Sequence, residues 1–403
     1  MSYSKVFIPY GAYWSTPFCK WQGSFSSQHP IKFAAQIAQK ALQERGIAPE
    51  TFDSSCLGWT VPSHHCFYGG PWAARLIGAE ITGPIISQAC ATGVKCTEYG
   101  GGEVELGRSE AFLAITADKC SNGPHIYYPN PLGPGGQGDK EDWVMDNFGF
   151  DPSPGAGKAM VMTAENVAKE EGITKEEQDE VALMRYQQYQ NALANDRAFQ
   201  KKYMVTPIEV KDARGKKTLA TVETDEGVMP STAEGLAKLR PVIKDGTVSF
   251  GSQTFPADGN AGLVLATKEK AAELSKDKSV EIQLISTGQA RVKPGFMPAA
   301  NEPAVKQALQ RAGIGVPDLK AITTHTPFAV NDVFLARKLE IKPEFANRYG
   351  CSLVWGHPQG PTGMRSIIEL IEELAELGGG YGLFTGCAAG DTAAALVLKV
   401  NVA

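Results

Sequence analysis

The chain has only six histidines, no two cysteines separated by two residues, and no long run of charge of one sign. Its eight cysteines are scattered, which argues against a zinc ribbon and, at 403 residues, against a disulfide framework. The net charge of -5 is opposite in sign to that of most nucleic-acid-binding surfaces. We therefore expect no nucleic-acid partner and no metal site. Adjacent His64 and His65 point different ways and make a poor ligand pair.

Basic and long apolar segments are also missing. Residues 1–10 contain no basic stretch followed by an apolar one, so they do not resemble a secretory signal. No apolar run is long enough to span a bilayer, and we expect a cytoplasmic protein without membrane contact. Hydrophobic residues make up 43% and charged residues 21% of the chain, which is typical of globular proteins. The length allows a duplicated or two-domain α/β body.

Short apolar runs rich in β-branched residues predict strands, and helical segments separate some of them. The predicted strands are 83–88, 111–116, 262–266, 281–285 and 394–399. Apolar strands with helices between them are typical of sheets that are covered on both faces. The pattern therefore predicts an α/β fold.

Three helical segments have informative details. One begins at Thr174, which forms a capping-box pattern with Glu177, and continues to about Asn195. A second, 367–376, has an apolar stripe with its acidic residues away from that stripe, and glycines at 378–380 end it. The third contains three consecutive glycines within 99–103, which destabilise a helix unless close packing requires them.

Glycine and proline are concentrated in residues 121–155, and this composition predicts a long ordered loop. We place an inserted loop domain at 121–246. It separates an N-terminal half, 1–120 plus 247–270, from a C-terminal half, 271–403.

One cysteine lies where chemistry is plausible. In Ile85–Gly93 an apolar strand ends in a turn of small residues that contains Cys90, and we expect a helix to follow. Backbone N–H groups and the dipole at a helix N-terminus stabilise a thiolate. The alternative is a thiol that packs in the core, where most free cysteines lie.

Three further turns carry candidate side chains. They are Gly356-His357-Pro358, Gly386-Cys387-Ala-Ala389-Gly390 and Thr324-His325-Thr-Pro-Phe328. A single histidine in such a turn is more often a hydrogen-bonded structural residue than a catalytic one.

The four turns, in this order and at these separations, resemble the thiolase superfamily. That family has a Cys-x-Ser-Gly turn, an Asn-Glu-Ala-Phe or His-Asp-Cys-Phe motif, a Gly-His-Pro motif and a final Cys-x-Gly. This chain has Thr92 in place of the serine and Ala389 in place of the last glycine. His325 is closer to the sterol-carrier and archaeal thiolases than to the asparagine type. The resemblance implies a thiolase fold, with two similar βαβ-type halves in a layered αβαβα arrangement and an inserted loop domain.

The resemblance also implies roles for these residues. Cys90 would be the nucleophile, His357 its base, and Cys387 the acid and base at the α-carbon. His325 would hold a water that forms one oxyanion site with His357, and the backbone N–H of Ala389 would serve the other. No cofactor is implied, because coenzyme A is a co-substrate. A homodimer or tetramer is implied, and some thiolases of the His type work with a small partner that has a zinc ribbon and an OB fold.

Coenzyme A should bind to the loop domain and near Thr254 and Phe255. Ala159 stands where many thiolases have a histidine, so we expect that contact to be missing. Candidate cations for the nucleotide phosphates are Lys216, Lys217, Lys238 and Arg240. The alternative, and the commoner case for a single lysine or arginine, is a solvated face.

The acyl group is not specified by the motifs. Aromatic residues are concentrated in 59–72, just before the Cys90 strand, and they either pack in the core or an interface or form a pocket for a bulky acyl group. The pocket interpretation favours cleavage of benzoylsuccinyl-CoA to benzoyl-CoA and succinyl-CoA, in the degradation of aromatic compounds. The alternatives are an acetoacetyl-CoA thiolase of biosynthesis and a non-catalytic CoA- or lipid-binding homologue. A decarboxylating ketosynthase pairs its cysteine with two histidines, and Cys387 argues against it.

Overall fold

The computed structural model describes residues 1–121, 123–149, 160–212 and 214–403, and two sheets dominate it. The first sheet has the order β1-β10-β5-β3-β4, with β2 paired to β10. Its strands are β1 Tyr13–Ser15, β2 Cys19–Lys20, β3 Ser54–Gly58, β4 Ile85–Ile86, β5 Ala111–Lys119 and β10 Ala257–Ala266. The second sheet has the order β11-β14-β13-β12. Its strands are β11 Val280–Arg291, β12 Leu319–His325, β13 Gly379–Ala388 and β14 Thr392–Val402.

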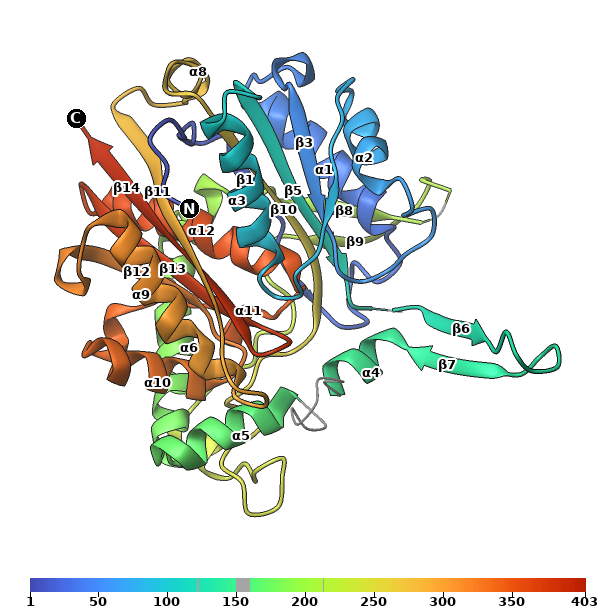
Figure 1. Ribbon diagram of the computed structural model, residues 1–403, viewed down its shortest axis with the longest axis vertical. Helices are drawn as coiled ribbons and strands as arrows, with labels where there is room; N and C mark the ends of the chain where they lie inside the picture. Colours follow the sequence, from blue (N-terminus) through green and yellow to red (C-terminus); the bar gives the residue numbers. More distant parts are fainter. Residues whose placement is uncertain (122, 150–159, 213) are drawn as a thin grey trace.

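Helices form layers around and between the two sheets (Figure 1). Helices α3 and α12 lie between the sheets, α1 and α2 cover the outer face of the first, and α9 covers the outer face of the second with α10 beside it. The αβαβα arrangement expected from the sequence is confirmed. The helices are α1 Pro30–Glu44, α2 Gly69–Ile77, α3 Thr92–Glu105, α4 Trp143–Gly149, α5 Met160–Glu171, α6 Lys175–Arg197, α7 Ala233–Ala237, α8 Lys268–Leu274, α9 Asn301–Ala312, α10 Ala329–Leu339, α11 Ser352–Trp355 and α12 Gly360–Glu376.

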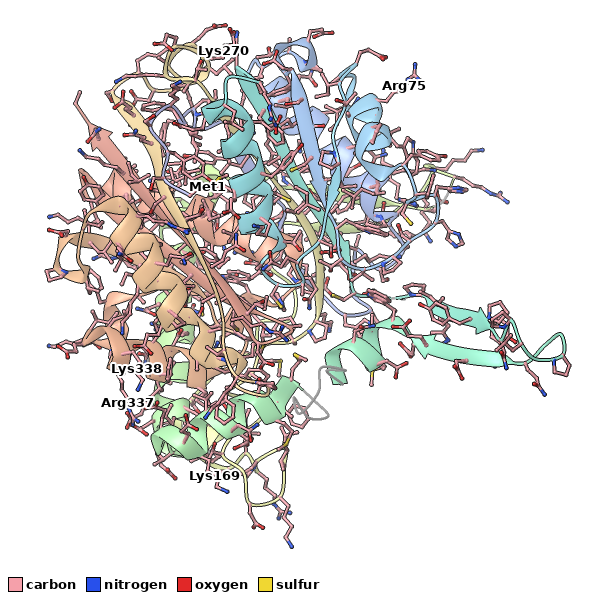
Figure 2. All side chains as sticks on the ribbon, viewed as in Figure 1. Met1, Arg75, Lys169, Lys270, Arg337 and Lys338 are labelled. Atoms are coloured by element: carbon pink, nitrogen blue, oxygen red, sulfur yellow. The ribbon has the colours of Figure 1, made fainter. Side chains whose placement is uncertain are left out.

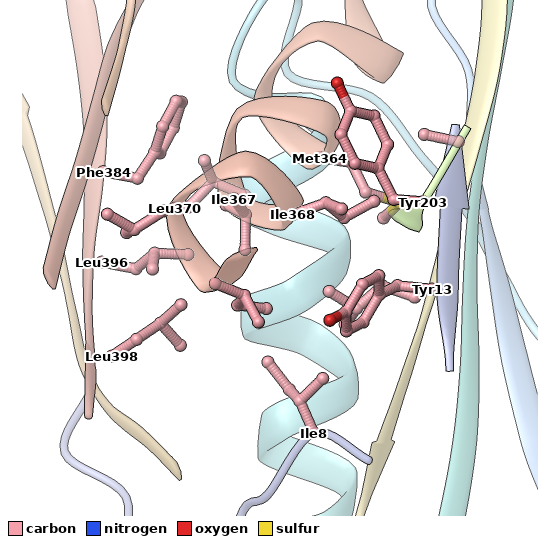
Figure 3. Packing of buried hydrophobic residues seen from close by; sticks show 14 of the residues in the cluster. Ile8, Tyr13, Tyr203, Met364, Ile367, Ile368, Leu370, Phe384, Leu396 and Leu398 are labelled. Atoms are coloured by element: carbon pink, nitrogen blue, oxygen red, sulfur yellow. The ribbon is translucent and has the colours of Figure 1, made fainter. Parts of the chain in front are cut away.

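Helix α12 is the centre of the core (Figure 3). Ile367 and Leu370 face Phe384 and Leu396 of the second sheet, while Tyr13 lies on the other side of the helix. Burial extends around the whole helix, so its acidic residues do not form the exposed face that an amphipathic helix would have.

Those buried acids are paired instead. Glu369 accepts hydrogen bonds from Tyr203 Oη at 2.6 Å and from Arg365 Nε at 3.0 Å. Glu372 accepts a hydrogen bond from Tyr13 Oη at 2.5 Å. Buried carboxylates need such partners, and the sequence pattern did not reveal them.

Glycines allow α3 to approach its neighbours closely. A Cβ at Gly93 would lie 2.6 Å from the backbone nitrogen of Met364, and one at Gly100 would lie 2.4 Å from Phe112 Cδ1. The close packing expected for the glycines of 99–103 is thus confirmed. Because Gly93 lets the N-terminal turns of α3 and α12 meet, it brings the two loops before these helices together.

Most predicted elements are present, with two corrections. The capping box at Thr174 is formed, and α6 loses helical backbone angles at Ala194–Asp196. The strand predicted at 83–88 is reduced to the two residues of β4. The region 121–155 is not simply a loop, because its described part contains an antiparallel hairpin, β6 His125–Pro129 with β7 Gly138–Asp142, and then α4.

This hairpin projects away from the layered body (Figure 1). A second hairpin pairs β8 Ile208–Lys211 with β9 Thr218–Val222. Charged side chains such as Arg75, Lys270 and Arg337 extend outward at the periphery (Figure 2). No helix among the described residues has the length and apolar character needed to cross a membrane.

Candidate active site

Cys90 lies in a strained turn between β4 and α3. The preceding residue, Ala89, has a φ of 44°, a region that residues other than glycine rarely occupy. Thr92 holds the turn, because its hydroxyl accepts a hydrogen bond from the N–H of Gln88 at 2.8 Å and donates to the carbonyl of Ala89 at 2.7 Å. A threonine can therefore replace the serine of the family at this position, since both residues have the hydroxyl that makes these two hydrogen bonds.

His357 is aimed at that sulfur by the loop before α12. Its backbone N–H donates to the carbonyl of Phe255 at 2.9 Å, and its Nδ1 lies 2.6 Å from Thr362 Oγ1. The other ring nitrogen, Nε2, lies 3.1 Å from Cys90 Sγ. Because both ends of the ring are held, the imidazole is fixed in the orientation that proton exchange with Cys90 requires.

His325 is the last residue of β12 and lies against His357. The two rings stack with centroids 4.1 Å apart and planes inclined by 27°. Ser352 Oγ lies 2.8 Å from His325 Nδ1, whereas Nε2 of His325 has no partner among the described residues. A buried ring nitrogen without a protein partner is suited to a water or a substrate oxygen.

Cys387 reaches the same place from the neighbouring strand. It lies in β13, one residue before the end, and not in the turn as predicted. Strands β12 and β13 are parallel and pair His325 with Gly386, where a Cβ would lie 2.9 Å from the Cβ of His325. Parallel strands end at the same edge of a sheet, so His325 and Cys387 emerge together.

Burial controls the ionisation of the nucleophile. It raises the pKa of Cys90 to about 12, and hydrogen bonds from the backbone N–H groups of Ala389 and Cys90 only partly oppose this rise. Burial also lowers the pKa of His357 to about 3. At neutral pH both groups are uncharged. The backbone N–H groups favour a thiolate, as expected from the sequence, but desolvation outweighs them, so the resting nucleophile is a thiol.

The second thiol is also protonated at rest. Burial raises the pKa of the Cys387 thiol above its usual range. The N–H of Ala389 acts on Cys90 as the predicted backbone donor would. The structure thus brings together all five residues for which the sequence predicted a role in catalysis.

The sequence did not single out three further polar residues at this site. Gln359 accepts a hydrogen bond from the thiol of Cys90, with Sγ and Oε1 3.2 Å apart. Asn331 donates from Nδ2 to Cys387 Sγ at 3.1 Å. Asp118 accepts hydrogen bonds from the backbone N–H groups of Thr60 at 2.8 Å and of Gly360 at 2.9 Å, and burial raises its pKa to about 7.

The sequence alone gave only weak indications of Gln359 and Asn331. Gln359 is a large polar residue between His357-Pro358 and a glycine, and its φ of 60° marks a constrained turn. Asn331 is six residues beyond His325, on a helix whose first turn is buried. Neither position shows from sequence which sulfur it contacts.

Three side chains of the site, those of Cys90, His325 and His357, also resemble a set of metal ligands. The ligand atoms of Cys90, His325 and His357 lie within 4.8 Å of one another. The two imidazole rings are stacked, however, so their in-plane lone pairs run side by side and do not converge on one point as a tetrahedral ion requires. The geometry is better suited to proton transfer than to ligation.

The predicted coenzyme-binding residues have mixed positions. Thr254 is half-buried and donates its hydroxyl to the carbonyl of Ser352 at 2.5 Å, while Phe255 holds the backbone of His357. The four candidate cations are all exposed. Lys216 and Lys217 lie in the turn between β8 and β9, and Lys238 and Arg240 follow α7. The four cations therefore form two pairs in two separate parts of the chain. Ala159 lies outside the described residues.

The aromatic segment divides into a packed and an exposed part. Trp59 and Trp72 are half-buried against the core that contains α1. The backbone N–H of Trp59 donates to the carbonyl of Ile86 at 3.0 Å, which places Trp59 beside the strand that leads to Cys90. Phe67 has 96% of its surface exposed.

Together, these groups can carry out covalent acyl chemistry. A thiol with a neutral base in contact can become a nucleophile, a second buried thiol can exchange a proton, and backbone N–H groups can stabilise a developing oxyanion.

Comparisons with known proteins agree with this chemistry. Residues 12–269 match the family described as Thiolase, N-terminal domain, and residues 279–400 match Thiolase, C-terminal domain. The human peroxisomal 3-ketoacyl-CoA thiolase is 28% identical over 383 residues, covering 94% of this chain and 87% of that protein. A cytosolic acetyl-CoA acetyltransferase of Gibberella zeae is 27% identical and covers 95% of this chain and 96% of that protein.

Solved structures give the same result. The acetyl-CoA acetyltransferase of Bacillus anthracis superposes with a TM-score of 0.89 at 27% identity, covering 99% of both chains. The human mitochondrial 3-ketoacyl-CoA thiolase superposes with a TM-score of 0.87 at 27% identity, covering 98% of both chains.

Proposed function

Because this chain belongs to the thiolase family of acyltransferases, we propose that it cleaves a 3-ketoacyl-CoA with coenzyme A through an acyl thioester on Cys90. The observation that carries the proposal is the contact of 3.1 Å between Cys90 Sγ and His357 Nε2, with Cys387 on the strand next to His325, whose ring stacks on that of His357. Two separate thiols are needed because one holds the acyl group while the other exchanges the proton of the α-carbon.

The proton from Cys90 moves to His357 as the sulfur attacks the 3-keto carbon. The bond between C2 and C3 then breaks, and Cys387 gives its proton to the enolate of the departing acyl-CoA. Coenzyme A attacks the acyl-Cys90 thioester, its thiol proton returns to Cys387, and the proton on His357 returns to Cys90. Every group is restored, and the resting pair is neutral, so the charged pair forms only during attack.

Two oxyanions arise in this sequence. We assign the one on the 3-keto oxygen to the backbone N–H groups of Cys90 and Ala389, which already act on the sulfur. The other, on the thioester oxygen of the enolate, falls to His357 and a water held by the unpaired Nε2 of His325. Loss of one such donor typically costs about 3–4 kcal/mol of barrier. An alanine at 389 keeps its N–H, so the donor survives the departure from the family glycine.

We propose benzoylsuccinyl-CoA as the substrate, cleaved to benzoyl-CoA and succinyl-CoA. Support comes from Trp59, which is held beside β4, and from the aromatic residues that follow it. Aromatic side chains suit a bulky, flat acyl group. The competing substrate is acetoacetyl-CoA, which the similarity to acetyl-CoA acetyltransferases favours.

A panel of 3-ketoacyl-CoAs, aromatic and linear, separates these substrates. Each is incubated with coenzyme A, and the products are identified by mass spectrometry. We expect the aromatic member to give the highest kcat/KM, and preference for acetoacetyl-CoA would replace the substrate while leaving the reaction intact. Cys90→Ala should show no cleavage of any member. Full turnover by that variant would reject the acyl-Cys90 scheme, and no turnover by the unchanged protein would favour a non-catalytic CoA-binding role.

We further propose a loop domain at 121–246 that takes part in coenzyme A binding together with Thr254 and Phe255, and self-association into a dimer or tetramer. Strand β4 lies at an open edge of its sheet, and such edges pair readily with another chain. A small partner with a zinc ribbon is proposed on the strength of the His-type motif alone. Light scattering after size exclusion, with zinc analysis of anything that co-purifies, tests both.

A further inference from the structure

The second thiol has an amide neighbour that the mechanism above leaves unused. Asn331 Nδ2 lies 3.1 Å from Cys387 Sγ, and the two residues have 2% and 0% of their surface exposed. Asn331 lies in the first turn of α10, where its backbone N–H donates to the carbonyl of Phe328 at 2.9 Å. The side chain is therefore held against the sulfur from a fixed position on the helix.

We propose that Asn331 is the positioning residue of Cys387, and that its N–H group stabilises the thiolate left when Cys387 gives its proton to the enolate. In that step the S–H bond breaks, a C–H bond forms at the α-carbon, and the electron pair stays on sulfur. The inference deepens the proposed function and rests on it for the identity of the proton acceptor.

The surroundings of Cys387 make such a donor necessary. Burial and the carboxylate of Asp332 disfavour the thiolate, and the hydrogen bond from Asn331 acts in the opposite direction. A hydrogen bond to a charged partner is stronger than one to a neutral partner. Asn331 therefore stabilises the thiolate more than the thiol, which is the difference that eases proton release.

The two sulfurs have amide partners of opposite polarity. The carbonyl oxygen of Gln359 accepts a hydrogen bond from the thiol of Cys90, and this contact favours the protonated form of Cys90. Asn331 presents an N–H to Cys387, which favours the thiolate. This difference suits a mechanism in which Cys90 loses its proton only to His357, while Cys387 must exist transiently as an anion.

A purely structural role does not account for Asn331. Its Oδ1 is buried and has no partner among the described residues, which is costly for an amide that serves only packing. Asn301 provides the contrast, because its Oδ1 accepts from Thr385 Oγ1 at 3.0 Å and its Nδ2 donates to the carbonyl of Pro298 at 3.2 Å. Asn301 is equally buried and contacts the same strand two residues before Cys387.

The first test compares two activities of the same protein. Cleavage of a 3-ketoacyl-CoA needs both thiols. Exchange of an acyl group between its acyl-CoA product and dephospho-CoA can proceed with Cys387 protonated throughout, because His357 takes the proton of Cys90 and gives it to the departing coenzyme A thiolate. Asn331→Leu, which keeps the side-chain volume, should lower cleavage by roughly tenfold or more and acyl exchange by less than about twofold. Asn301→Ala should lower the thermal midpoint without changing the ratio of the two rates. An equal fall in both activities of Asn331→Leu, or unchanged cleavage, overturns the proposal.

The second test does not depend on any substrate. In a Cys90→Ser background, methyl methanethiosulfonate labels Cys387, and peptide mass spectrometry follows the labelling between about pH 7 and pH 10, below the raised pKa of this buried thiol. Both Asn331→Leu and Asn331→Asp should slow the labelling roughly tenfold at each pH, because both lose the N–H donor without opening a cavity. Labelling as fast as in the Asn301→Ala control refutes the donor role. If the unchanged protein cleaves no 3-ketoacyl-CoA, the proposed function fails while this labelling still decides the inference.

Discussion

We predict that Cys90 is a neutral thiol at neutral pH, so that replacing it with serine removes no thiolate signal. A thiol next to a histidine can rest either as a neutral pair or as a thiolate with an imidazolium. Burial raises the pKa of Cys90 to about 12 and lowers that of His357 to about 3, so the neutral pair is the stable form over the intervening pH range. We expect the nucleophile to be generated during attack and not stored beforehand.

The size of the effect follows from the pKa. Each pH unit below the pKa lowers the ionised fraction tenfold, so at pH 7 about one Cys90 in 100,000 is a thiolate. An unperturbed thiol, with a pKa of about 8.5, would be ionised at roughly 3%. A stored ion pair would give nearly one thiolate per chain. The ionised fractions in these three cases differ from one another by more than tenfold.

Thiolates have an absorption band in the ultraviolet at wavelengths longer than peptide absorption, where thiols are nearly transparent. A difference spectrum between the unchanged protein and Cys90→Ser therefore measures the thiolate directly. We expect no difference from pH 5 to pH 8. The difference should emerge only in strongly alkaline solution, as pH approaches the raised pKa. A full thiolate signal at pH 7 that vanishes in Cys90→Ser would falsify the neutral pair and restore stabilisation by the N-terminus of α3. Thermal unfolding of both proteins checks that the substitution leaves the fold unchanged.

Three other predictions concern single contacts. Gln359→Leu removes the acceptor that favours the protonated Cys90 thiol and should raise kcat/KM for cleavage by up to about fivefold, because a neutral hydrogen bond is worth about 1 kcal/mol, at an unchanged thermal midpoint; unaltered kinetics would show that this hydrogen bond does not affect proton loss from Cys90. Gly93→Ala should destabilise the protein by about 1–3 kcal/mol in urea unfolding, because the added methyl overlaps the backbone of α12. Arg365→Met strands the buried carboxylate of Asp225 and should cost about 3–5 kcal/mol in the same assay, and a loss below 1 kcal/mol would contradict the pairing.

The fold was largely predictable because its signals are local. The capping box at Thr174 and the apolar strands each depend on neighbours within a few residues. The hairpin β6/β7 was missed because a composition rich in glycine and proline is shared by loops and by tight hairpins. The acids of α12 looked exposed, since a sequence does not show that Tyr13 and Tyr203 approach them from distant segments.

The sequence by itself determined which side chains are available for chemistry, because the four motifs that contain the two cysteines and the two histidines can be recognised from the order of the residues. Only the tertiary structure decided how those groups behave. The ionisation of Cys90 depends on the protein that displaces water around it, and the partners Gln359 and Asn331 come from different elements of the fold. Desolvation and contacts of this kind are properties of packing, which brings together residues as far apart in sequence as Cys90 and Gln359, at 269 positions.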